Sequence, residues 1–461
     1  MSQSQTQRSS RVDLLHGSIL KSLLLFALPI MASRVFQQIY NTMDTLIVGH
    51  TLGDSSIAAM GACSSIYEMM TGFTFGVGNG LAIVTARCFG RQETERMKKS
   101  VASCIVIGIT VTLVVTVLAT IFMHPLLRLL KTPAEILEES YSYISILSVF
   151  LFVMFAYNLC SGLLGAIGNS FMPLVFLIIS SLVNIVLDLL FIRSFGMGVR
   201  GAAIATVISQ TLSAAFVLYF LKKRSELNVR FLTRSELSQC TETAKNIISL
   251  GTAGFIMQLT NSLVSICCNN VLSVTGGDIY ISVMTIISSV RQLVETPIYA
   301  MNEGSSPILS YNYGARRPKR VKQAIGTMAV MIFVYTAAMW SVIIVAPHFL
   351  IGIFSSDSEL IKDAVPALKL YFAAFIFMDL QYIGQTTFKS LNKKKQAIFF
   401  SLLRKVFIVV PLTYLLPYAL GMGTRGVFMA EPVSNVIGGS LCFLTMLATV
   451  IPELNHMEKQ K

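Results

Sequence analysis

Hydrophobic runs long enough to cross a membrane recur along the whole chain, separated by short polar loops. A helix needs about 20 predominantly apolar residues to span the hydrocarbon core. These runs lack the short alternating segments of membrane strands, so they indicate helices. The pattern predicts an all-α polytopic membrane protein with twelve transmembrane helices, at residues 19–46, 56–85, 100–123, 139–162, 171–192, 200–221, 246–272, 279–311, 324–346, 366–388, 396–418 and 425–450.

Composition and charge placement agree with this pattern. Only 13% of the residues are charged, whereas a soluble domain carries about 25%. With a cytoplasmic N-terminus, 25 of the 36 Lys and Arg residues fall in cytoplasmic loops and seven in the opposite ones. This asymmetry predicts a multi-pass protein of the cell membrane with both termini in the cytoplasm. It also accounts for the net charge of +13 without a nucleic-acid partner.

The sequence repeats itself after about half its length. The segment Gly-Met-Gly-Val-Arg-Gly at 196–201 recurs as Gly-Met-Gly-Thr-Arg-Gly at 421–426. Six helices per half is an even number, so both halves enter the membrane from the same side. This predicts two parallel six-helix lobes related by a pseudo-two-fold axis along the membrane normal. The predicted divisions are an N-terminal tail at 1–18, lobes at 19–221 and 246–450, a linker at 222–245 and a C-terminal tail at 451–461.

Two hydrophobic segments contain ionisable residues at membrane depth. Asn184 and Asp188 are four residues apart and share one helix face, and Asp44 lies on the first helix. Placing a charge at this depth costs at least ~2.5–3.5 kcal/mol, so such residues usually face the protein interior and mark an ion or substrate path. We expect Asp44 and Asp188 to meet inside the N-terminal lobe. Two close carboxylates would share one proton or bind one Na⁺ as a unit.

Other charged residues within the helices are secondary candidates for a transport role. Arg291 and Glu295 are spaced to pair with each other on one helix. The eight cysteines lack metal-ligand spacing, and the chain contains no P-loop or nucleophile elbow. We therefore expect no cofactor, no metal centre and no enzymatic activity. The complete secondary set is Glu68, Arg291, Glu295, Asp379 and Glu431.

With these residues in place, the whole chain resembles the multidrug and toxic compound extrusion (MATE) family, and its first lobe resembles the DinF-like branch. The matching features are Asp44, the Asn184-to-Asp188 pair and the turn from 196 to 206. The resemblance implies two six-helix lobes around a cavity. It also implies a cation-coupling site of Asp44, Asn184, Asp188 and Thr206, a polar network of Gln37, Tyr40 and Asn158, and a helix bend at Pro29.

The predicted function is secondary active efflux of cationic or amphipathic organic compounds by antiport with H⁺ or Na⁺, carried out by a monomer. Two alternatives stay open. One is a lipid-linked oligosaccharide flippase of the same superfamily architecture, which needs a cationic cavity; Arg34, Arg291, Arg404 and Lys405 are candidates for it. The other is a membrane receptor or scaffold that transports nothing, because fold does not fix function.

Overall fold

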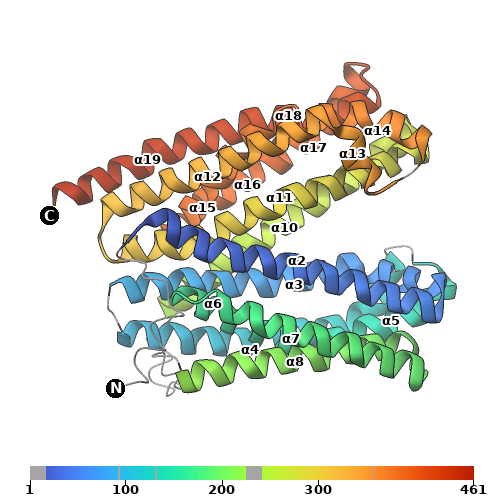
Figure 1. Cartoon of the computed structure of the whole chain (residues 1–461), viewed down its shortest axis with the longest axis horizontal. Coiled ribbons are helices and arrows are strands. Elements are labelled where there is room, and N and C mark those ends of the chain that lie inside the picture. Colours follow the sequence, from blue (N-terminus) through green and yellow to red (C-terminus); the bar gives the residue numbers. More distant parts are fainter. Residues whose placement is uncertain (1–16, 92–93, 130–131, 225–240, 356, 461) are drawn as a thin grey trace. The chain divides into compact units, whose positions relative to one another are not determined.

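The computed structural model describes residues 17–91, 94–129, 132–224, 241–355 and 357–460 (Figure 1). These residues are almost entirely helical, and no strand occurs among them. The predicted all-α fold is therefore confirmed. The predicted N-terminal tail and most of the predicted linker lie outside the described residues.

Every predicted membrane segment falls in a helical region, although some of these regions consist of more than one helix. Seven helical runs in the described part of the chain are long and apolar enough to cross a membrane, or eight if the bent pair α5–α6 is one span. Others, such as α11 with Arg291, Glu295 and Glu303, are more polar than a typical span. The helices are α2 (Ile19–Leu52), α3 (Asp54–Gly90), α4 (Thr94–Leu129), α5 (Ala134–Val149), α6 (Leu151–Ala166), α7 (Phe171–Asp188), α8 (Gly198–Arg224), α10 (Thr241–Thr275), α11 (Gly277–Gly314), α12 (Pro318–Val345), α13 (Pro347–Gly352), α14 (Ser358–Tyr371), α15 (Phe375–Ser390), α16 (Lys394–Leu402), α17 (Val410–Tyr414), α18 (Thr424–Ser434) and α19 (Ser440–Lys459).

Several spans are interrupted where the sequence predicts continuous helices. α5 and α6 meet at Phe150 with a bend of 47°, and the carbonyl of Ser148 next to this break accepts a hydrogen bond from Thr116 Oγ1 at 3.0 Å. A neighbouring side chain thus satisfies a backbone group near the bend, as membrane helices require. Four segments are π-helical: η1 (Leu189–Ser194), η2 (Leu403–Val409), η3 (Leu415–Ala419) and η4 (Asn435–Gly439).

Contacts divide the chain into two compact units. Among the described residues, unit 1 lies within 28–255, and unit 2 combines 17–27 with those from 256 onward. Within unit 1, α3 packs along α6 and α7 along α8; within unit 2, α11 packs on α12 and α15 on α19 (Figure 1). The predicted lobe boundaries stay predictions, as does the bend at Pro29, which lies inside a single α-helix, α2.

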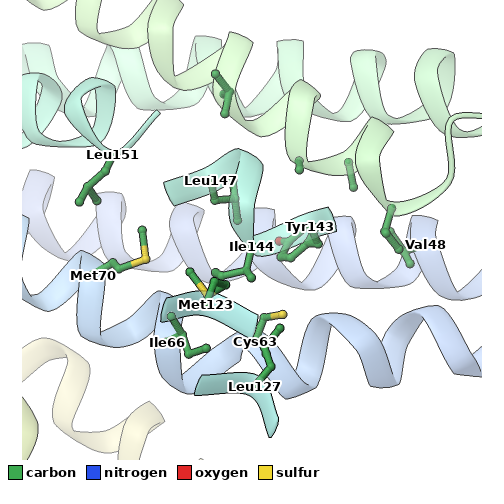
Figure 2. Packing of buried hydrophobic residues seen from close by; sticks show 14 of the residues in the cluster. Val48, Cys63, Ile66, Met70, Met123, Leu127, Tyr143, Ile144, Leu147 and Leu151 are labelled. Atoms are coloured by element: carbon green, nitrogen blue, oxygen red, sulfur yellow. The ribbon is translucent and has the colours of Figure 1, made fainter. Parts of the chain in front are cut away.

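A large apolar core of unit 1 lies beside the predicted coupling residues. Val48 of α2 follows Asp44 by one turn, and Ile192 of η1 follows Asp188 by one turn; both belong to this core. Figure 2 shows how residues from several helices converge on it. The core thus fixes α2 and the end of α7 next to the two aspartates. Its labelled members are Val48, Cys63, Ile66, Met70, Met123, Leu127, Tyr143, Ile144, Leu147 and Leu151.

Glycines allow α3 and α6 to approach closely. A Cβ added at Gly162 would lie 2.7 Å from the Gly78 carbonyl oxygen, and one added at Gly78 would lie 2.9 Å from the Asn158 carbonyl oxygen. Small residues commonly permit such contact between membrane helices. The glycine-rich stretch of α3 therefore serves helix packing at Gly78.

We expect Gly162→Val to destabilise unit 1, because the new side chain must push against backbone atoms of α3. Overpacking of this kind typically costs about 1–3 kcal/mol. Thermal unfolding of the purified protein in detergent would show a lower midpoint. Gly165→Val is the matched control on the same helix, since a Cβ there meets no atom within 4 Å. Equal midpoints for the two variants would contradict this account.

Candidate functional site

The C-terminal half of α7 carries its polar residues on one face. Asn184 and Asp188 are fully buried, whereas Leu182 and Val186 on the other side are 61% and 64% exposed. Membrane helices orient this way when apolar side chains face lipid and costly polar groups face protein. Asp188 is also the last α-helical residue before the π-helical segment η1. Such π segments occur frequently at functional sites.

Asn184 connects Asp188 to α8. With the amide nitrogen oriented toward the carboxylate, it donates to Asp188 Oδ2 at 2.8 Å, and the amide oxygen accepts from the backbone N–H of Thr206 at 3.2 Å. The Thr206 hydroxyl in turn accepts from Tyr40 Oη at 3.1 Å. One chain of hydrogen bonds therefore runs from α2 through α8 to α7.

Asp44 and Asp188 lie close enough to interact as a carboxyl pair. Both side chains are buried. An ionised carboxylate only accepts hydrogen bonds, so a bond between two carboxyl groups requires that one of them hold a proton. Each aspartate also has one oxygen, Oδ1, without a hydrogen-bond partner among the described residues. The pair can therefore bind one proton between its members and still offer two free acceptor atoms.

Two tyrosines and a glutamine near the pair were not predicted from the sequence. Tyr67 of α3 hydrogen-bonds to Gln210 of α8, and both Tyr67 and Tyr143 of α5 lie close enough to interact electrostatically with Asp44. Gln210 follows Thr206 by one helical turn, so it shares a face with a predicted residue. That spacing was the available signal for Gln210.

Other predicted residues of unit 1 lie outside this cluster. The Gln37 and Glu68 side chains are exposed. Asn158 Nδ2 donates to Thr74 Oγ1 at 3.1 Å, where it joins α6 to α3. Arg34 lies over the ring of Phe75, 5.1 Å from its centroid. The structure thus joins Asp44, Asn184, Asp188, Thr206 and Tyr40, but it does not bring Gln37 or Asn158 into their hydrogen-bond chain.

Unit 2 contains a second buried cluster, of which the sequence predicts only the pairing of Arg291 with Glu295 and, for the flippase alternative, a grouping of the cations. Arg291 Nε donates to Glu295 Oε1 at 2.5 Å, and its Nη1 donates to Tyr371 Oη at 2.6 Å. Glu431 accepts from Arg404 at 3.2 Å and from Lys405 at 3.0 Å, and it lies 3.5 Å from Arg291 Nη2. Three cations and two carboxylates therefore form one network, which we call the unit 2 charge network: Arg291, Glu295, Arg404, Lys405 and Glu431.

Asp379 of α15 lies close enough to Glu295 of this network to interact with it electrostatically. Its Oδ1 accepts from Thr336 Oγ1 at 3.0 Å, and its Oδ2 has no hydrogen-bond partner in the part of the chain that the structure describes. No salt bridge to Asp379 occurs among those residues. The described residues also contain no group of three or more His, Cys, Asp and Glu that could hold a metal ion.

An apolar hollow of about 730 Å³ lies between α5 and α8. Thr211 is the only polar residue of its lining, which includes Ile146, Phe150, Ile204 and Ile208. It contains no ionisable group, so we assign it no ion chemistry.

Comparison with known proteins decides the family. The sequence model of the MatE family matches residues 29–190 and again residues 254–415, so it covers most of the chain. The chain belongs to the MATE family. The two MATE matches begin 225 residues apart, which is the spacing at which the Gly-Met-Gly segment repeats. This family comprises transporters rather than enzymes, and the chain is a multi-pass membrane protein.

MATE relatives match along nearly the full chain. The probable multidrug resistance protein YoeA of Bacillus subtilis is 24% identical over 437 residues, covering 94% of this chain and 93% of YoeA. The multidrug export protein MepA of Staphylococcus aureus is 23% identical, and the match covers 94% of this chain and 93% of MepA. The crystal structure of a MATE protein in a bent conformation superposes with a TM-score of 0.89 at 22% identity. The match covers 97% of this chain and 98% of the MATE chain in that structure. The homologues are multidrug efflux transporters, and the fold is that of MATE.

Proposed function

We propose that this protein exports organic compounds from the cell by antiport and that the Asp44–Asp188 pair binds the coupling ion. The observation that carries this proposal is the pair of interacting carboxyl groups buried in unit 1. A buried carboxyl pair is costly to maintain and contributes no apolar packing, so a structural role explains it poorly. The pair also lies on α2 and α7, where the resemblance to the DinF-like branch places the coupling site.

The few oxygen atoms available to coordinate a cation at this site favour H⁺ over Na⁺ as the coupling ion. Sodium binds through oxygen atoms, and Asn184 presents its amide nitrogen to Asp188 while its oxygen is taken by the Thr206 N–H. The Thr206 hydroxyl accepts from Tyr40. The two carboxyl groups are therefore the principal oxygens left for a cation. A proton needs only these two groups.

The working cycle follows from the two charge states of the pair. With one shared proton, the pair carries one negative charge, and a hydrogen bond between Asp44 and Asp188 holds α2 against α7. When the proton leaves, two like charges lie close together in a site of low polarity and repel each other. This repulsion biases α2 and α7 toward a different arrangement. A membrane potential supplies about 2.3 kcal/mol per charge per 100 mV to drive proton entry.

The names of the relatives support the proposed substrates. YoeA and MepA are named as multidrug resistance and multidrug export proteins, and we propose the same class, cationic or amphipathic organic molecules, for this chain. We further propose that it works as a monomer in the cell membrane with both termini in the cytoplasm. The support for this orientation is the excess of basic residues in the predicted cytoplasmic loops.

Flux measurements in proteoliposomes test the proposal. We expect ethidium to be moved against its gradient when an inward-directed pH gradient is imposed, and a Na⁺ gradient at equal pH to drive little movement. Transport driven equally by Na⁺ alone would contradict the assignment of H⁺. An absence of movement under either gradient would contradict the antiport proposal itself, provided that the reconstituted protein is shown to be folded.

A further inference from the structure

The unit 2 charge network carries more positive than negative charge. Arg291, Arg404 and Lys405 interact with only two carboxylates, Glu295 and Glu431. The side chains of Arg404, Lys405, Glu295 and Glu431 are each 6% exposed or less. An uncompensated charge in such a site is strongly unfavourable, and buried charges are normally paired. With all five groups ionised, the network carries one net positive charge.

Within the described residues, the three cations form no ion pair with any further carboxylate. Asp379 interacts electrostatically with Glu295, but its hydrogen bond is with Thr336 and it forms no ion pair there. The other groups that contact the network are neutral: Tyr371 accepts from Arg291, Tyr382 donates to Glu295 Oε2 at 3.1 Å, and Asn435 Oδ1 accepts from Arg404. An anion from outside the chain would complete the network.

One member of the network occupies a repeat position of the unit 1 site. At the 225-residue spacing of the Gly-Met-Gly segments, Glu431 corresponds to Thr206 and Asn435 to Gln210. Arg404 and Lys405 lie in η2, and Asn435 begins η4, just as η1 begins after Asp188. Both halves thus combine π-helical segments with buried ionisable residues. The two clusters differ in charge, since the unit 1 site has two carboxyl groups and the unit 2 charge network has a cationic excess.

We propose that the unit 2 charge network is a binding subsite for an acidic group, a carboxylate or a phosphate, on a transported compound. The acidic group would enter at Arg291, whose side chain is 20% exposed and is the most accessible of the five. The 3.5 Å separation of Arg291 Nη2 from Glu431 leaves this edge of the guanidinium loosely held. A guanidinium binds carboxylates and phosphates through paired N–H groups.

This subsite extends the proposed function to compounds that carry an acidic group beside their apolar or cationic parts. The subsite proposal rests on the proposed function only because it treats the ligand as a transported compound. Binding of a ligand at equilibrium can be measured without an ion gradient, so it is independent of antiport. A failure of the subsite would therefore leave gradient-driven ethidium export intact, and a failure of antiport would leave binding of an anionic probe intact.

Two dyes with one scaffold and opposite charge provide the test. Carboxyfluorescein is anionic and rhodamine 6G is cationic, and fluorescence anisotropy reports their binding to the full chain in nanodiscs of neutral lipid. We expect Lys405→Met to bind carboxyfluorescein at least about tenfold more weakly, since it removes the excess positive charge and a charged hydrogen-bond donor from the network. Lys405→Arg, which keeps the charge, should remain within about threefold of the unaltered protein.

Lys319→Met is the matched control, because it removes a lysine charge from a side chain that is 79% exposed. It should leave carboxyfluorescein binding unchanged, and none of these variants should weaken rhodamine 6G binding.

Anionic lipid added to the nanodiscs distinguishes two sources of the acidic group: competition with the dye identifies a lipid headgroup, and no competition identifies a solute. Equal carboxyfluorescein affinity for Lys405→Met and the unaltered protein would overturn the proposal and make the network a closed structural cluster.

Discussion

Asp188→Asn should abolish gradient-driven export while the protein still folds and inserts. Asparagine keeps the size of the side chain and its hydrogen-bonding capacity, but it cannot exchange a proton with Asp44. Without that exchange, an imposed pH gradient has no site through which to act. Ethidium movement in proteoliposomes should therefore fall to the level of protein-free liposomes under a gradient that drives the unaltered protein.

Thermal stability separates this loss from misfolding. Removing a carboxyl group that is costly to bury should leave the unfolding midpoint unchanged or raise it. The corresponding gain in unfolding free energy should be at most about 2 kcal/mol, as often follows when strain at a functional site is relieved. Glu359→Gln is the control, since this exposed residue lies in the first turn of α14. Export by Asp188→Asn at the rate of the unaltered protein would make Asp188 structural. Coupling would then have to be sought at Asp379 or Glu431.

Much of the unit 1 site could be predicted because local spacing determines it. Asn184 and Asp188 are one helical turn apart, so any α-helix places them on one face. Their burial follows from the cost of exposing them to lipid. The partner Asp44 could be inferred because few carboxylates occur in the apolar runs of that half. The hydrogen bond from Tyr40 to Thr206 also joins two residues that the sequence analysis selected.

The unit 2 charge network could not be predicted, because it depends on long-range packing and on a departure from α-helical geometry. Consecutive α-helical residues point in directions about 100° apart. The sequence therefore gives no reason to expect Arg404 and Lys405 to reach one carboxylate. Both lie in the π-helical segment η2, and both donate to Glu431. The break at Phe150 was similarly hidden, since no Pro or Gly marks that position.

Glu431→Gln should strongly destabilise the protein, and Lys405→Met should rescue it. Glu431 interacts with all three cations of the unit 2 charge network. Its neutralisation leaves three cations with one carboxylate, and breaking a buried ion pair in this way costs about 3–5 kcal/mol. Adding Lys405→Met returns the excess to a single positive charge, as in the unaltered protein. The unfolding midpoint of the double variant should therefore lie well above that of Glu431→Gln.

The size of this rescue measures the charge balance directly. Residues in one ion-pair network give non-additive effects on stability, so the double variant should be more stable than the sum of the single changes predicts. Glu458→Gln is the matched control: Glu458 contacts two lysines, Lys319 and Lys322, but at a more exposed site. Surface pairs contribute about 0–1 kcal/mol, so its loss should be small. If Glu431→Gln and Glu458→Gln unfold at the same midpoint in detergent, the excess positive charge is already neutralised within unit 2. The acidic-group subsite would then lose its electrostatic basis.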